Sequence, residues 1–102
     1  MVSLRDEFLN GGGCPVIDAH GHLGPFRSIY LPEAAPEAMI AGMDRAGVEA
    51  LVVSPHSALF GDTREGNAEM LEAVCAYPGR FYGYCTVHPG YPGEIEGEFD
   101  QL

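Results

Sequence analysis

Apolar residues recur along the chain in short continuous runs and in stripes with helical spacing. The continuous runs cover residues 14–20, 48–54 and 80–87, bounded by glycine or proline, which is typical of short strands. The stripes cover residues 37–46, 67–77 and 94–102, and a shorter one covers residues 3–9. Apolar side chains at a spacing of three or four residues predict helices there, because such residues share one helix face. Between the first strand and the first long helix we expect an irregular segment, since it holds Pro25, Pro32 and Pro36.

Strands and helices therefore alternate, which predicts an α/β fold with parallel strands and right-handed crossovers. Three such units are few, because a (β/α)8 barrel takes roughly 250 residues. Helices on one face of three strands would leave the other face of the sheet uncovered. A doubly wound sandwich is the alternative, but it normally carries a glycine-rich phosphate turn just after the first strand, whereas Gly11, Gly12 and Gly13 precede that strand.

Candidate chemistry is concentrated in the segment Asp18-Ala19-His20-Gly21-His22. Side chains at i and i+2 of a strand lie on the same face, so His20 and His22 can direct two imidazole nitrogens at one metal ion. Asp18 falls on that face as well, where it could orient a histidine or line the cavity below the metal. The pair stands at the carboxyl end of a first parallel strand, which is the end where α/β proteins build their sites.

Composition and charge exclude several classes of protein. The chain is 46% hydrophobic and 20% charged, as in ordinary globular domains, and it contains no apolar stretch of membrane-spanning length and no signal peptide. We therefore expect a soluble, cytoplasmic protein. Its net charge of -10 makes nucleic acids and membranes poor partners. The cysteines, Cys14, Cys75 and Cys85, lack CxxC spacing, so we interpret them as small buried residues.

Three segments of the chain resemble a known family of enzymes. They are IDAHGHLG at residues 17–24, MDRAGVEALVVSP at 43–55 and GNAEMLEAVCAYPGRFYGYCTVHP at 66–89. In this order they resemble the N-terminal part of the amidohydrolase-related (amidohydrolase 2) TIM-barrel metal-dependent hydrolases. That family also contains non-oxidative decarboxylases such as aminocarboxymuconate-semialdehyde decarboxylase.

The resemblance implies that residues 1–102 are an incomplete barrel domain, with a cap at 1–13 and the first three βα units at 14–102. It also implies that His20 and His22 are the first two ligands of a catalytic divalent metal, most often Zn²⁺, which would activate water against a small organic substrate. The family's later ligands, two histidines and an aspartate, would follow further along the barrel. No residue of this chain is thereby identified as catalytic, and His88 stands where the family often has asparagine.

Other polar residues have both a functional and a structural interpretation. His56 and His88 follow the second and third strands, where each could contact substrate or be a solvated loop residue. Arg27 and Tyr30 belong to a long loop that could act as a substrate lid or be a surface excursion. On the third strand we expect Tyr82, Tyr84, Thr86 and His88 to face the barrel interior, and Phe81, Gly83, Cys85 and Val87 to face the helices. The acidic residues Glu65, Glu69, Glu72, Glu94, Glu96 and Glu98 indicate solvated helix faces.

Two hypotheses about function follow. In the first, the chain is the N-terminal part of a metal-dependent hydrolase or decarboxylase. In the second, it acts without catalysis as a self-associating or partner-binding domain that keeps the histidine pair as a remnant or a structural metal site. A barrel continuing downstream of Leu102, with a histidine and a strand-terminal aspartate, would favour the first.

The uncovered sheet face leads to a prediction about association. Repulsion from a net charge of -10 acts over a Debye length of about 8 Å, whereas each Å² of apolar surface buried contributes about 25 cal/mol. We therefore expect a homo-oligomer, or association with the rest of the barrel, through exposed strand edges or the interior face. Sedimentation at micromolar concentration tests this expectation, and a compact monomer would contradict it.

Overall fold

The computed structural model describes residues 6–7 and 14–101. Three strands form one sheet in the order β1-β2-β3, with β1 at Ile17–Leu23, β2 at Ala50–Pro55 and β3 at Phe81–Gly83. Both pairings are parallel, which confirms the expected α/β fold with three parallel strands. The predicted helix at residues 3–9 lies, apart from residues 6–7, outside the described residues.

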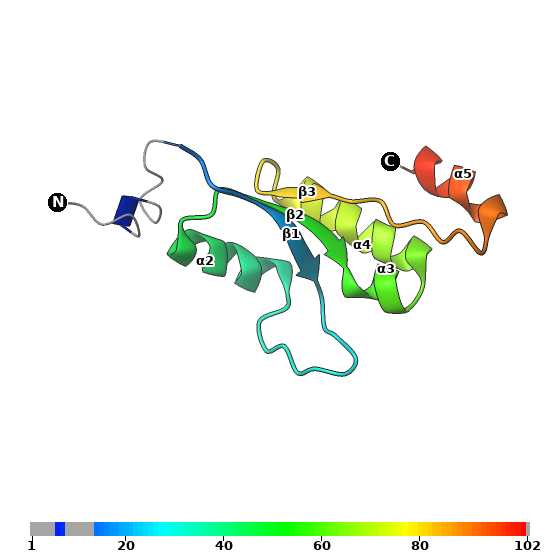
Figure 1. The fold of residues 1–102 in the computed structure, drawn as a ribbon, viewed down its shortest axis with the longest axis horizontal. Coiled ribbons are helices and arrows are strands. Elements are labelled where there is room, and N and C mark those ends of the chain that lie inside the picture. Colours follow the sequence, from blue (N-terminus) through cyan, green and yellow to red (C-terminus); the bar gives the residue numbers. More distant parts are fainter. Residues whose placement is uncertain (1–5, 8–13, 102) are drawn as a thin grey trace.

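Helices connect the strands in the expected order. Helix α2 (Pro36–Ala46) joins β1 to β2, α3 (His56–Phe60) and α4 (Thr63–Ala76) join β2 to β3, and α5 (Pro92–Asp100) follows β3. Figure 1 shows α2 and α4 running alongside the strands, and α5 at the end of the molecule toward which β1 and β2 point. Helix α2 ends at Gly47, whose φ of 73° is the left-handed conformation that favours glycine.

The hydrophobic core lies between the sheet and the helices α2 and α4. It consists of Leu23, Met43, Leu51, Val53, Met70, Ala73 and Phe81. Because side chains alternate along a strand, burial of Phe81 directs Tyr82 and Tyr84 to the other face. Tyr82 and Tyr84 are 53% and 50% exposed, so this second face meets solvent. The expected division of the third strand into a helix-facing and an open face is confirmed for these residues.

Several boundaries differ from the sequence prediction. The short helix α3 was not predicted, because five residues carry no measurable periodicity. Helix α4 begins at Thr63 and not at residue 67, since the Asp62 side chain accepts hydrogen bonds from the backbone N–H groups of Arg64 (2.8 Å) and Glu65 (3.1 Å). Strand β3 ends at Gly83 and not at residue 87.

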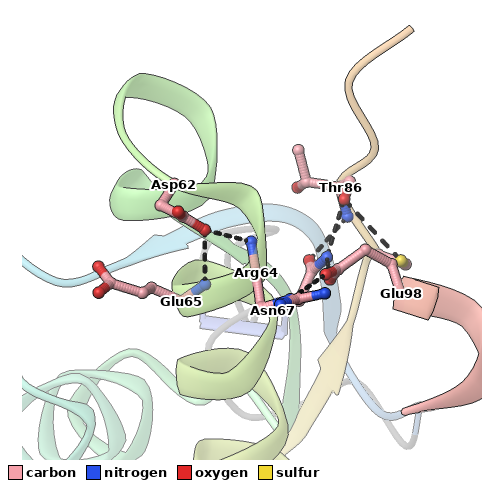
Figure 2. Close-up of polar contacts among 7 residues, drawn as sticks. Asp62, Arg64, Glu65, Asn67, Thr86 and Glu98 are labelled. Carbon is pink, nitrogen blue, oxygen red and sulfur yellow. Dashed lines mark hydrogen bonds and ion pairs between the residues drawn. The ribbon is translucent and has the colours of Figure 1, made fainter. Parts of the chain in front are cut away.

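A buried polar cluster explains why β3 is short (Figure 2). The Asn67 side chain donates to the Thr86 carbonyl at 2.8 Å and accepts from the Thr86 N–H at 2.9 Å, so that segment pairs with α4 and not with a strand. Asn67 also donates to the Glu98 carboxylate at 2.7 Å, and Arg64 Nε lies 3.5 Å from Glu98 Oε1. Glu98 is only 3% exposed, so its interpretation as part of a solvated helix face was wrong.

The cysteines also differ from expectation. Cys14 and Cys75 are exposed and Cys85 is half-buried, so the interpretation of all three as buried core residues was wrong. The buried side of α4 consists of Gly66, Asn67, Met70 and Ala73, and Cys75 lies on the exposed side of that helix. Partial burial, reinforced by the negative charge of Glu98, raises the pKa of the Cys85 thiol.

Within residues 6–7 and 14–101, the helices are all too short or too polar to cross a membrane.

The contact between α3 and α4 generates a prediction. A methyl group added at Gly66 would overlap the Ala58 backbone, whereas one added at Gly42 in α2 would meet only the end of Arg45 at 3.8 Å. We expect Gly66→Ala to lower the free energy of unfolding by about 1–3 kcal/mol despite its better helix propensity. Gly42→Ala should be neutral or stabilising. Urea titrations of both variants test this, and equal stabilities would contradict the tight contact.

The cluster around Asn67 generates a second prediction. Asn67→Ala removes the donor of the buried Glu98 and both partners of Thr86, so we expect it to destabilise the fold by about 2–4 kcal/mol. Glu72→Ala, on the exposed side of the same helix, should change stability by less than about 0.5 kcal/mol. Thermal or urea unfolding of both variants measures the difference. An Asn67→Ala variant as stable as Glu72→Ala would show that the cluster does not hold α5.

Candidate functional site

The histidine pair sits on the open face of the sheet at the carboxyl end of β1. Gly21, between the histidines, faces the core, and a side chain there would come within 2.8 Å of the Leu51 side chain. Alternation then places His20 and His22 on the opposite, open face. The pairing of β1 with β2 shifts between Asp18 and Gly21, which is a bulge of one residue.

Asp18 stabilises this bulge. Its carboxylate accepts a hydrogen bond from the backbone N–H of His20 at 3.0 Å. Asp18 thus acts on the backbone of the motif, and not on an imidazole ring as one sequence hypothesis had it. Because of the bulge, Asp18 is in register with the core residue Leu51, whereas His22 is in register with Ser54 on the open face.

The two imidazole rings converge through corresponding nitrogen atoms. His20 Nε2 and His22 Nε2 lie 3.1 Å apart, and the rings meet edge to face at 82° with centroids 5.0 Å apart. Two ligands of a tetrahedral zinc ion with Zn–N bonds of about 2.0–2.1 Å lie roughly 3.3 Å apart. The donor pair therefore fits two positions of such a shell. The same separation also permits an N–H···N hydrogen bond between the rings.

Hydrogen bonding defines the tautomer of His22. Its Nδ1 lies 3.1 Å from the Ser54 carbonyl oxygen and 3.2 Å from Ser54 Oγ. Since a carbonyl oxygen only accepts, Nδ1 carries the proton and donates it to Ser54. The lone pair of neutral His22 is then on Nε2, the nitrogen that faces His20. Metal-ligating histidines are held in this way.

His56 is the third imidazole at this end of the sheet. It stacks on His22 at 4.9 Å with an angle of 25° between the ring planes, and its Nδ1 donates to the Gly24 carbonyl at 2.9 Å. Its Nε2 therefore also carries a lone pair when the ring is neutral. The hydrogen bond ties the start of α3 to the loop that follows β1.

Hollows adjoin the rings of His22 and His56. One of about 360 Å³ is lined by His22 and His56 together with Phe26, Ile29, Leu31, Leu59 and Phe60. A cleft of about 480 Å³ shares Phe26, His56 and Phe60 with it and extends to Arg27 and to the acidic residues Asp62, Glu65 and Glu69. The loop after β1 thus lines both hollows through Phe26. A loop that acts as a substrate lid would have to lie there. Tyr30 in that loop is 87% exposed and lines neither.

His88 is placed differently from the other histidines. Its Nδ1 accepts a hydrogen bond from the Gly90 N–H at 3.0 Å, and its ring lies against Tyr91 at 4.9 Å. These contacts belong to the exposed segment between β3 and α5. Among the described residues, the structure brings together His20, His22 and His56, while the contacts of His88 are local.

In the part of the chain that the structure describes, His20 and His22 could fill at most two positions around a metal ion. Within it, no group of three or more histidine, cysteine, aspartate or glutamate side chains converges on one metal position. His56 stacks face to face with His22, so its ring nitrogens do not join the pair. Water or groups from elsewhere would have to supply the remaining ligands.

Sequence reasoning missed the residues that orient the histidines. Ser54 pairs with His22 across β1 and β2, and its position at the end of the second strand was the available signal. Ser57 donates to Glu69 at 2.6 Å at the edge of the cleft, although Glu69 was interpreted as merely solvated. Glu69 is half-buried because it contacts Ser57 in helix α3, which the sequence did not predict.

Comparison of the chain with protein-family models, with curated proteins and with solved structures finds no match.

Proposed function

We propose that the chain supplies the first three βα units of a TIM-barrel metal-dependent hydrolase of the amidohydrolase-related type. The observation that carries the proposal is the approach of His20 Nε2 and His22 Nε2 to 3.1 Å at the carboxyl end of β1. In barrels of this architecture the reacting groups stand at that end of the strands. His20 and His22 would be the first two ligands of the metal, with the remaining ligands contributed from outside the described residues.

Each residue of the site has a role in this proposal. His20 and His22 bind the metal, and Ser54 holds His22 with Nε2 available. When bound, a divalent ion such as Zn²⁺ polarises a substrate carbonyl and acidifies water. His56 lines both hollows beside the pair, where its Nε2 can accept a hydrogen bond from a small organic substrate. Non-oxidative decarboxylation is the alternative reaction at the same site.

A second candidate function is self-association without catalysis. Two observations favour it: the described residues contain no group of three or more possible metal ligands, and Tyr82 and Tyr84 on the open sheet face are about half exposed. In that case the histidine pair would hold a structural ion or none. The coordination of the metal separates the two candidates, because catalytic zinc sites keep an open position and structural ones are closed.

Zinc titration of the 102-residue chain tests the metal pair. We expect weak binding, because two imidazoles fill half of a usual shell, and at least about a tenfold loss of affinity in His20→Ala and in His22→Ala. His88→Ala removes a histidine whose described contacts are local, and it should bind zinc like the parent chain. Competition with a chromophoric chelator measures all four proteins. Equal zinc uptake by all of them would refute the site.

Acetohydroxamate then distinguishes an open site from a closed one. This bidentate metal ligand should bind to the zinc-loaded chain and not to the metal-free chain or to His22→Ala, because open coordination positions are needed. Zinc uptake without hydroxamate binding would contradict the hydrolase proposal and favour a structural ion. Calorimetry of the parent chain and His22→Ala at the same zinc concentration, and of the parent chain without zinc, makes the comparison.

A further inference from the structure

The hollow beside His22 is unusually apolar for a surface feature. Ile29, Leu31, Leu59 and Phe60 line it although they are 59%, 38%, 43% and 59% exposed. Phe26 meets Phe60 edge to face at 4.8 Å and His56 at 5.1 Å, so two aromatic rings and an imidazole surround the space. A volume of about 360 Å³ lies within the usual range for small-molecule sites.

The aromatic residues separate this hollow from an acidic cleft. Phe26, His56 and Phe60 line both spaces, so the cleft begins where the hollow ends. Asp62, Glu65 and Glu69 in the cleft outnumber its single cation, Arg27. Asp62 is engaged as the cap of α4, and Figure 2 shows Glu65 pointing away from the cluster around Glu98.

Glu69 is the best-positioned carboxylate of the cleft. It is half-buried, and the Ser57 hydroxyl holds one of its oxygens at 2.6 Å. The other oxygen lies against Gly24, where a side chain would come within 2.8 Å of it. Glu69 is thereby fixed beside the same loop that carries Phe26, in the cleft that shares Phe26, His56 and Phe60 with the apolar hollow.

We propose that this site takes substrates with an aromatic body and a cationic ammonium or amidinium group. The aromatic ring occupies the hollow that Phe26 and Phe60 line, and the cationic group reaches Glu69 in the cleft. The group to be cleaved then faces His22, on the other side of the hollow. This proposal rests on the proposed function for the position of the reacting group, while the recognition of ring and charge needs no metal.

Charge and shape together give this selectivity. A cationic group in the cleft gains from the fixed carboxylate of Glu69, whereas an anion of the same size meets three carboxylates and one guanidinium. The net charge of -10 adds to the same preference. An aliphatic amine lacks the ring that fills the hollow, so it should bind more weakly than an aromatic amine.

Four small probes test the proposal on the metal-free chain. Benzylamine carries both features, benzyl alcohol only the ring, butylamine only the cation, and benzoate the ring with the opposite charge. Chemical-shift titrations at neutral pH should rank benzylamine first, with an affinity of about millimolar for a fragment of this size. Benzoate should bind at least about tenfold more weakly. Benzoate binding as tightly as benzylamine would overturn the proposal.

Matched variants locate the binding. Phe60→Ala should weaken benzylamine and benzyl alcohol alike, by about three- to tenfold, whereas Phe99→Ala removes a phenylalanine of equal 59% exposure from α5 and should weaken neither. Glu69→Gln should weaken benzylamine by about threefold or more and leave benzyl alcohol unchanged. Glu72→Gln, on the exposed side of α4, is its control. Circular dichroism of each variant confirms folding before titration.

The outcomes separate this inference from the proposed function. Zinc bound by His20 and His22 with no preference for benzylamine would overturn the substrate class alone. Benzylamine binding that depends on Phe60 and Glu69, in a chain that takes up no zinc, would support the recognition site and contradict the hydrolase. Equal effects of Phe60→Ala and Phe99→Ala would show that the hollow is not where the ring binds.

Discussion

Burial of one face of a three-stranded parallel sheet is the constraint on which the rest of the structure depends. Leu51, Val53 and Phe81 must face α2 and α4 to form the core. Because side chains alternate, the same burial sends the intervening residues to the open face. His22 and Ser54, which pair across β1 and β2, therefore both lie on the open face. The arrangement of the candidate site is therefore a consequence of packing on the opposite side of the sheet.

The two ends of the sheet are held by different chemistry. At the end where the strands begin, the Arg80 guanidinium donates to the Glu49 carbonyl and to the Asp44 carboxylate, at 2.7 Å each. These bonds join the residue before β3 to helix α2 and to the turn that follows it, and they engage no imidazole. At the end where the strands finish, hydrogen bonds from His22 and His56 to backbone carbonyls orient rings whose Nε2 atoms are left available. This division, with structural bonds at one end and available lone pairs at the other, is the usual one in parallel α/β folds.

Helix α3 contributes more to the site than its length suggests. It begins at His56, and its packing against α4 through Ala58 and Gly66 places Phe60 beside Phe26. It also brings Ser57 to Glu69. The apolar hollow and the acidic cleft consequently share one wall. A ligand that recognises both would have to match the distance between the phenylalanine rings and the carboxylate.

The sequence by itself determined the parallel α/β architecture, the open face of β3 and the location of the histidine pair at the end of β1. These follow from local pattern, because apolar runs, helical stripes and i, i+2 spacing are properties of neighbouring residues. Only the tertiary structure decided that Asp18 stabilises a bulge, that Ser54 orients His22, and that His56 but not His88 stacks on His22. It also buried Glu98, which the sequence placed in solvent, by pairing it with Asn67 at a separation of 31 residues. Such contacts depend on which elements far apart in the chain pack together. The periodicity of a single element does not indicate which other elements it will contact.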